Sequence, residues 1–292
     1  MEKIQLSNGI TLPLVGIGTF PMKGEELSRS ILIALNEGYR LLDSAISYKN
    51  ETDLGCVLSQ IDGCGVRRED LIISSKVDCW TLAGSKEFGY TNGKSILQAF
   101  TETKDNLGVE YLDIYLLHQP FKFIANQPGI DYLKAYEILI DLYDKGYVKA
   151  IGVSNFSVLE LEQIKTHCGV YPMINQIELS VFNSEEEVVN YCKENNIHVE
   201  AYSPFGRGNL IKEIEQNALL QKIAKRYNKT VFQVALRWIA QRGITVITRS
   251  SNEERIKQNI DIFDFKLSDV EIRQINTLNQ NKTFGVNKII KR

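Results

Sequence analysis

The sequence predicts an α/β fold of the (β/α)8 TIM-barrel class, with an N-terminal β-hairpin and extra helices after the seventh strand and at the C-terminus. Short segments rich in Val, Ile and Leu alternate with helix-like segments along the chain. These short segments are nearly continuous apolar runs, as expected for strands buried on both faces of a parallel sheet. The 292 residues exceed the roughly 250 that such a barrel needs. We therefore expect a single domain over residues 1–292.

A doubly wound sheet is the main alternative fold. Its glycine-rich nucleotide loop would have to be Gly16-Ile17-Gly18-Thr19-Phe20-Pro21, where proline stands in place of the third glycine of GxGxxG. The barrel is therefore favoured, and any nucleotide must be bound in another way.

The chain opens with a predicted hairpin, residues 4–6 and 10–12, because Asn8-Gly9 is a strong signal for a two-residue turn. An apolar run at 14–20 follows as the first barrel strand. A helix over 24–37 ends at Gly38, since glycine is favoured just past helix C-termini. The second strand, 39–43, leads to a helix over 50–60.

Six further strand and helix pairs follow in the same alternation. The later strands are expected at 71–76, 111–118, 147–153, 173–178, 197–202 and 244–248. The later helices are expected at 94–107, 131–145, 158–167, 185–195, 215–227, 231–242, from 252 onward, and at 268–278 with Ser268 as N-cap. Two long aromatic loops, 78–93 and 120–129, are either substrate walls or ordinary surface loops.

The composition limits the classes of partner. The net charge is −2, without the basic face that nucleic-acid or membrane-surface binding would need. The five cysteines are scattered and form no CxxC pair, which favours reduced thiols over disulfides or a zinc site. No signal peptide or membrane-spanning run is recognised. We expect a cytoplasmic monomer without a metal.

Polar residues recur where the predicted strands end. They are Asp43, Lys76, His118, Ser154, Asn155, Gln176, Glu178, Tyr202 and Arg249. Taken singly, each has an ordinary explanation: Asn155 could be a helix N-cap, and Tyr202 could belong to the core. Because the carboxyl ends of barrel strands meet at one face, the repetition favours a shared site.

Asp43 and Tyr48 lie five residues apart, and both need a nearby cation. Asp is rarely buried without a partner, and a phenol has an ordinary pKa of about 10. Lys76 would supply the charge, pairing with Asp43 and lowering the pKa of Tyr48 so that it can act as a general acid. His118, expected to be neutral, would orient a carbonyl oxygen. The sequence offers no nucleophile for that carbonyl, so hydride from a nicotinamide is expected.

These motifs resemble the signatures of the aldo-keto reductase family over essentially the whole chain. The matching segments are DSAISYKNE at 43–51, SSK at 74–76, YLLHQP at 115–120, GVSNF at 152–156, NQIEL at 175–179 and AYSPFG at 201–206. The resemblance implies a catalytic tetrad of Asp43, Tyr48, Lys76 and His118, with Tyr48 as proton donor. It also implies NADPH bound in an extended form without a Rossmann fold.

The resemblance extends to the NADPH contacts. Ser154, Asn155 and Gln176 would bind the nicotinamide carboxamide, and Tyr202 would stack on the ring. In segment 248–259, two arginines would hold the 2′-phosphate, since arginine grips phosphate bidentately; the alternative is a charged surface helix. The cofactor contacts expected beyond these four are Gly18, Thr19, Asp43, Ser203, Phe205 and Arg207 (the last three near the pyrophosphate), Arg249, Ser250 and Arg255 (at the 2′-phosphate), and Gln258 and Asn259 (at the adenine).

The expected substrate contacts are Phe20, Tyr48, Trp80, His118 and Phe121. The sequence departs from the family pattern at Phe20, where tryptophan is common, at Ser180-Val181, where His-Pro is usual, and at Thr248, where proline is usual. The loop 78–93 is longer than usual, and the tail 279–292 is short, which predicts an open site.

The expected function is NADPH-dependent reduction of an aldehyde or ketone to an alcohol. Two alternatives remain: a sugar, polyol or alcohol dehydrogenase that works in the oxidative direction, and a non-catalytic NADPH-binding redox sensor. The complete tetrad argues against the sensor, because a protein that only binds has no need of an acid.

Overall fold

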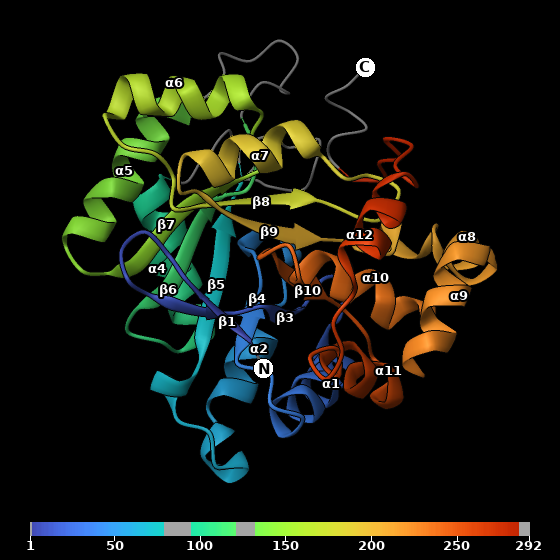
Figure 1. The fold of residues 1–292 in the computed structure, drawn as a ribbon. Coiled ribbons are helices and arrows are strands. Elements are labelled where there is room, and N and C mark those ends of the chain that lie inside the picture. Colours follow the sequence, from blue (N-terminus) through green and yellow to red (C-terminus); the bar gives the residue numbers. More distant parts are fainter. Residues whose placement is uncertain (1, 79–94, 121–131, 286–292) are drawn as a thin grey trace.

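The computed structural model describes residues 2–78, 95–120 and 132–285, and its strands form the predicted barrel. Within these residues, eight parallel strands close in the order β10-β3-β4-β5-β6-β7-β8-β9, at the centre of the molecule (Figure 1). Their bounds are β3 Val15–Gly18, β4 Leu41–Asp43, β5 Ile72–Val77, β6 Leu112–Leu117, β7 Val148–Ser154, β8 Ile174–Glu178, β9 His198–Tyr202 and β10 Thr245–Thr248. The (β/α)8 class is therefore confirmed.

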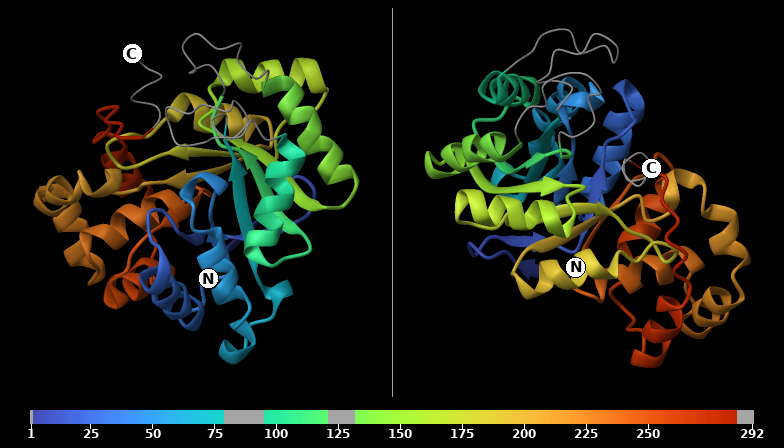
Figure 2. Two further views of the ribbon diagram at one scale, coloured as in Figure 1. Left: turned by 180° about the vertical axis from the view of Figure 1, so that it is seen from behind. Right: turned by 90° about the horizontal axis from the view of Figure 1, so that it is seen from above.

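Helices surround the strands on all sides, as the two further views show (Figure 2). The helices that follow the barrel strands are α1 Gly24–Asn36, α2 Glu51–Leu58, α4 Ile96–Leu107, α5 Tyr132–Asp144, α6 Val158–Cys168, α7 Glu186–Glu194, α10 Val231–Ala240 and α11 Glu253–Ile260. The extra helices are α8 Ile211–Gln216 and α9 Ala218–Tyr227 after β9, and α12 Asp269–Asn276 near the C-terminus. No helix in the described ranges has the length and apolar character needed to cross a bilayer.

The N-terminal hairpin is confirmed, and residues 7–9 connect its strands as expected. Strand β1 Lys3–Gln5 pairs antiparallel with β2 Thr11–Pro13. A backbone hydrogen bond of 2.8 Å from Leu6 N to Ile10 O encloses a loop of residues 7–9. Gly9, with φ of 90°, takes the positive-φ position at the end of that three-residue loop.

The hairpin contributes apolar side chains to the barrel interior. Leu6 and Leu12 are buried in one apolar cluster with inward-facing residues of the barrel strands. The cluster members from the strands are Leu41, Ile114, Leu116, Ala150, Ile174 and Ile247. Because apolar side chains fill this part of the barrel interior, the polar side chains gather at the carboxyl ends of the strands.

Two helix boundaries depend on capping side chains. The single helix expected over 215–227 is wrong, because Asn217 ends α8 and its side chain caps α9 by accepting from the Leu220 amide at 3.1 Å. Ser268 is confirmed as the N-cap of α12. Asn155 is not a helix N-cap, since α6 begins after Ser157.

Candidate active site

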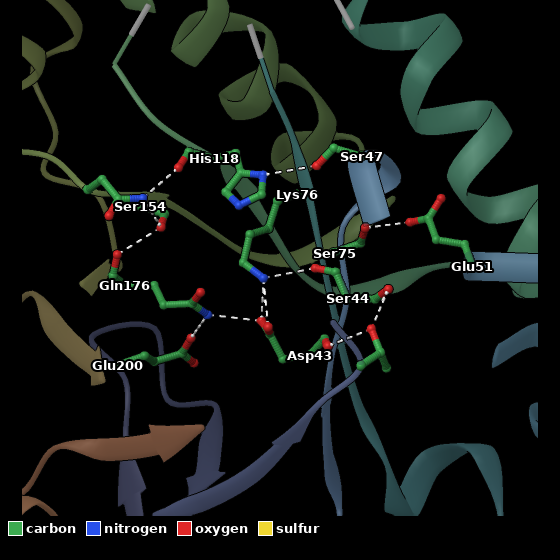
Figure 3. A network of polar contacts seen from close by, with 12 residues as sticks. Asp43, Ser44, Ser47, Glu51, Ser75, Lys76, His118, Ser154, Gln176 and Glu200 are labelled. Carbon is green, nitrogen blue, oxygen red and sulfur yellow. Dashed lines mark hydrogen bonds and ion pairs between the residues drawn. The ribbon is translucent and has the colours of Figure 1, made fainter. Parts of the chain in front are cut away.

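An ion pair between Asp43 and Lys76 lies inside the barrel at the carboxyl ends of β4 and β5 (Figure 3). Lys76 is fully buried, and its Nζ donates to both Asp43 carboxylate oxygens at 2.7 Å and to the Ser44 carbonyl at 2.9 Å. Burial by itself would lower the pKa of Lys76, but Asp43 and Tyr48 together raise it above its ordinary value. Lys76 is therefore charged at neutral pH.

Tyr48 lies next to this cation. It ends a short 3-10 turn, η1 Ile46–Tyr48, and its ring centroid is 5.3 Å from Lys76 Nζ. Burial raises the pKa of Tyr48, and this effect outweighs the lowering by the charge and hydrogen bond of Lys76. The lowering by Lys76 is thus present, but the expected net decrease in pKa is wrong. Tyr48 is protonated at neutral pH, and Lys76 is placed to stabilise the phenolate left after proton transfer.

His118 follows β6 and approaches Tyr48 edge-on, with ring centroids 5.6 Å apart. Burial, with the charges of Lys76 and Arg207, lowers the pKa of His118 to about 3. The ring is therefore neutral, as expected. Its Nδ1 lies 3.4 Å from the Ser47 hydroxyl (Figure 3). If that hydroxyl donates to Nδ1, the proton sits on Nε2, which can then donate to a carbonyl oxygen.

A buried layer of polar side chains spans the barrel beside Tyr48. It consists of Asp43, Lys76, Gln176 and Glu200. Gln176 Nε2 donates to Asp43 Oδ1 and to Glu200 Oε2, both at 2.9 Å. Strands β4 and β8 stand opposite each other in the barrel order, so the Gln176–Asp43 bond crosses the interior. The layer therefore connects opposite walls of the barrel.

Ser154, Asn155 and Tyr202 form a second polar group. The Tyr202 hydroxyl donates to Asn155 Oδ1 at 2.6 Å, and Asn155 Nδ2 donates to Ser154 Oγ and to the His118 carbonyl, both at 2.9 Å. Asn155 has φ of 64°, a conformation that Asn adopts more readily than most residues. This backbone turn points the amide across the site, instead of along the helix as an N-cap would.

A cavity of about 1020 Å³ joins these groups to a distant basic end. Most of the predicted site residues line it: Gly18, Phe20, Asp43, Tyr48, His118, Ser154, Asn155, Gln176, Tyr202, Ser203, Phe205, Arg207, Arg249, Ser250, Arg255, Gln258 and Asn259. Lys76 and Thr19 do not line it. Thr19 is fully buried, and its hydroxyl donates to the Asp43 carbonyl at 3.2 Å. Trp80 and Phe121 lie outside the described residues.

The basic end of the cavity lies where β10 meets α11. Arg249 and Arg255 are exposed there, and neither forms an ion pair with a carboxylate in the described part of the chain. Ser250 Oγ accepts from the Asn252 amide at 3.1 Å, which orders the start of α11. Two exposed arginines and a hydroxyl at the start of a helix suit a phosphate. The donor set and the volume of the cavity therefore fit a phosphorylated dinucleotide.

Two acidic residues near the site have functions that the sequence analysis did not assign. Glu200 was not singled out, although it is the one charged residue in the run 197–202 and shares a strand face with Tyr202. Glu178 was noted only as a strand-end residue. Its carboxylate accepts from the Phe284 and Gly285 amides at 2.8 Å, which holds the C-terminal segment against the barrel. Period-two alternation could have identified Glu200, whereas nothing in the sequence links Glu178 to residues over 100 positions away.

Comparisons with known proteins agree with this geometry. The model of the Aldo/keto reductase family matches residues 14–280. The glyoxal reductase of Bacillus subtilis is 38% identical over 287 residues, covering 98% of this chain and 96% of that protein. An aldo-keto reductase from a Medee basin deep-sea metagenome library has a TM-score of 0.84 and 35% identity, covering 97% of both chains. The Bombyx mori aldo-keto reductase in complex with NADP has a TM-score of 0.86 and 31% identity, covering 99% of this chain and 96% of that one. The chain therefore belongs to the aldo/keto reductase family.

Proposed function

We propose that this chain reduces an aldehyde or ketone to an alcohol with NADPH, and that Tyr48 donates the proton. Family membership makes the chain an NAD(P)H-dependent oxidoreductase that acts on carbonyl compounds. The proposal adds the direction of the reaction, the choice of NADPH and the role of each residue.

One observation carries the proposal: a protonated tyrosine lies between a buried cation and a neutral histidine at the wall of a large cavity. Reduction of a carbonyl needs a hydride at carbon and a proton at oxygen. A bound reduced nicotinamide would supply the hydride. Tyr48 would give its hydroxyl proton to the carbonyl oxygen, Lys76 would stabilise the phenolate, and His118 would hydrogen-bond the oxygen.

The contacts at the two ends of the cavity support NADPH as the cofactor. Asn155 and Gln176 present amide groups to the cavity that Tyr48 also lines, which suits recognition of a carboxamide. Arg249 and Arg255 stand at the other end, where a 2′-phosphate would need cations. The Bombyx mori relative, which was solved with NADP, supports the same choice.

Among the described residues, Phe20 provides an aromatic surface next to the proposed proton donor. Phe20 is 48% exposed, and its ring lies 5.0 Å from that of Tyr48. An exposed aromatic ring beside the acid suits small or flat carbonyl compounds. Similarity to a protein named glyoxal reductase supports testing small aldehydes first.

A Tyr48→Phe variant tests the proposal. The variant should lose turnover by about 10²- to 10⁴-fold, the usual contribution of a general acid, and should keep its affinity for NADP⁺. NADPH consumption with a panel of aldehydes and ketones, together with calorimetric NADP⁺ binding, gives both readouts. The control is Tyr147→Phe, at an exposed tyrosine that does not line the cavity, which should leave both unchanged. Wild-type turnover in Tyr48→Phe would refute Tyr48 as the proton donor.

A further inference from the structure

Glu200 is a buried carboxyl group with only one of its two oxygens in use. It is fully buried on β9, directly opposite Gln176 on β8. Its Oε2 accepts from Gln176 Nε2 at 2.9 Å, while its Oε1 is buried and has no hydrogen-bond partner among the described residues. Burial raises the pKa of Glu200 to about 7, and the nearby charge of Asp43 adds to this. A carboxyl group is costly at such a position, so a function for it is expected.

The contacts of Gln176 indicate that function. An amide nitrogen carries two N–H donors, and here one is directed to Asp43 and the other to Glu200. The Oε1 atom of Gln176 is thereby turned away from both carboxyl groups (Figure 3). Gln176 also lines the cavity, and its Oε1 accepts no hydrogen bond from the residues that the structure describes. The amide thus offers an acceptor, and no donor, to a ligand beside Tyr48.

We propose that Glu200 is a positioning residue that, together with Asp43, holds the Gln176 amide with Oε1 as an acceptor for the NH₂ of the nicotinamide carboxamide. This inference rests on the proposed function. Asp43 by itself would occupy one N–H and leave the second free to turn toward the cavity. Glu200 occupies that second donor, so that only one orientation of the carboxamide finds a partner on Gln176.

A Glu200→Leu variant, compared across two ligands, tests this role. NADP⁺ contains the nicotinamide, whereas 2′,5′-ADP contains only the phosphorylated adenosine half. We expect Glu200→Leu to weaken calorimetric binding of NADP⁺ by about five- to ten-fold, the typical effect of one lost hydrogen bond, and to leave 2′,5′-ADP binding unchanged. Equal weakening of both ligands, or no weakening of either, would overturn the proposal.

Two further variants separate positioning from general packing. Glu200→Gln keeps a carbonyl oxygen facing Gln176 and should restore NADP⁺ affinity to within about two-fold of the wild type. Glu51→Gln is the matched control, because Glu51 is equally buried and burial raises its pKa to about 7, but its partners are Ser75 and Thr103 outside the cavity. It should leave NADP⁺ affinity unchanged. A Glu200→Gln variant as weak as Glu200→Leu would contradict the acceptor role.

A double-variant cycle shows whether Glu200 acts through Gln176. In a Gln176→Leu background, the added Glu200→Leu change should have no further effect on NADP⁺ affinity. The double variant has leucine at both position 176 and position 200, so neither apolar side chain faces an unpaired polar group there. The comparison with Gln176→Leu therefore remains usable if the single Glu200→Leu variant does not fold. A further loss in the double variant would overturn the proposal. All readouts are equilibrium binding, so a chain that bound NADP⁺ in this pattern but reduced no carbonyl would refute the proposed function and leave this inference standing.

Discussion

In a Lys76→Met variant, the buried carboxylate of Asp43 would lose its ion pair, while the volume of the side chain at position 76 would be nearly kept. Lys76 Nζ lies 5.3 Å from the Tyr48 ring centroid. At that separation, and with an effective dielectric constant of about 20, a unit charge contributes about 3 kcal/mol. The phenolate formed on proton transfer would lose this stabilisation, so turnover should fall by about two orders of magnitude. Breaking a buried pair should also cost about 3–5 kcal/mol of folding stability.

The assay is NADPH consumption at saturating cofactor, with urea unfolding measured on the same preparation. A double Asp43→Asn, Lys76→Met variant separates the two effects, because it leaves no unpaired carboxylate. Most of the stability should return, and the turnover should not. If folded Lys76→Met reduced carbonyls within about threefold of the wild-type rate, the assignment of Lys76 as the charge that assists Tyr48 would be refuted.

Three other expectations follow from single contacts. Arg255→Ala should raise the Michaelis constant for NADPH by about 10- to 100-fold and leave that for NADH unchanged, since it removes a charged hydrogen bond to the 2′-phosphate; equal effects would contradict the assignment. Burial raises the pKa of Glu51 from 4.5 to about 7, so folded protein keeps a proton that unfolded protein has lost. The stabilisation is complete below the unfolded pKa and is lost, by up to about 3 kcal/mol, as pH rises from there through the folded pKa; Glu51→Gln should lack this slope in urea melts at a series of pH values. Gly55→Ala would place Cβ 2.2 Å from the Asn106 carbonyl oxygen on the neighbouring α4, whereas Gly63 has nothing within 4 Å. Gly55→Ala should therefore lower the free energy of unfolding, measured in urea, by about 1–3 kcal/mol, and Gly63→Ala should lower it much less. Similar decreases in the two variants would show that the close approach at Gly55 does not affect stability.

The polar strand ends were accessible to sequence reasoning because parallel strands in a barrel all end at one face. Asp43, Lys76 and His118 come from three consecutive strand ends, and the structure places them in one group. The same argument located Arg249 after the last strand, and it lines the same cavity. Each of these positions depends only on where a strand stops, which a local pattern shows.

The direction of the net pKa shift of Tyr48 could not be predicted in this way. The sequence identified the cation that lowers the pKa, but the larger effect is burial, which raises it. Burial depends on what covers the hydroxyl, and segments from many parts of the chain contribute. The break at Asn217 was missed for a simpler reason, since it depends on one local hydrogen bond.

The alternation of apolar runs with helical segments is a local property, and it was enough to determine the barrel, the order of its elements and the face that carries the polar residues. Whether a given polar side chain has a partner is not local. Gln176 and Asp43 are 133 residues apart in the chain, yet their bond crosses the barrel because β8 and β4 close on opposite sides. Glu200 joins this group through the hydrogen bond that it accepts from Gln176. The alternation of residues along the strand could have shown that Glu200 faces the barrel interior. Its function depends on the partners that closure of the barrel brings to Gln176.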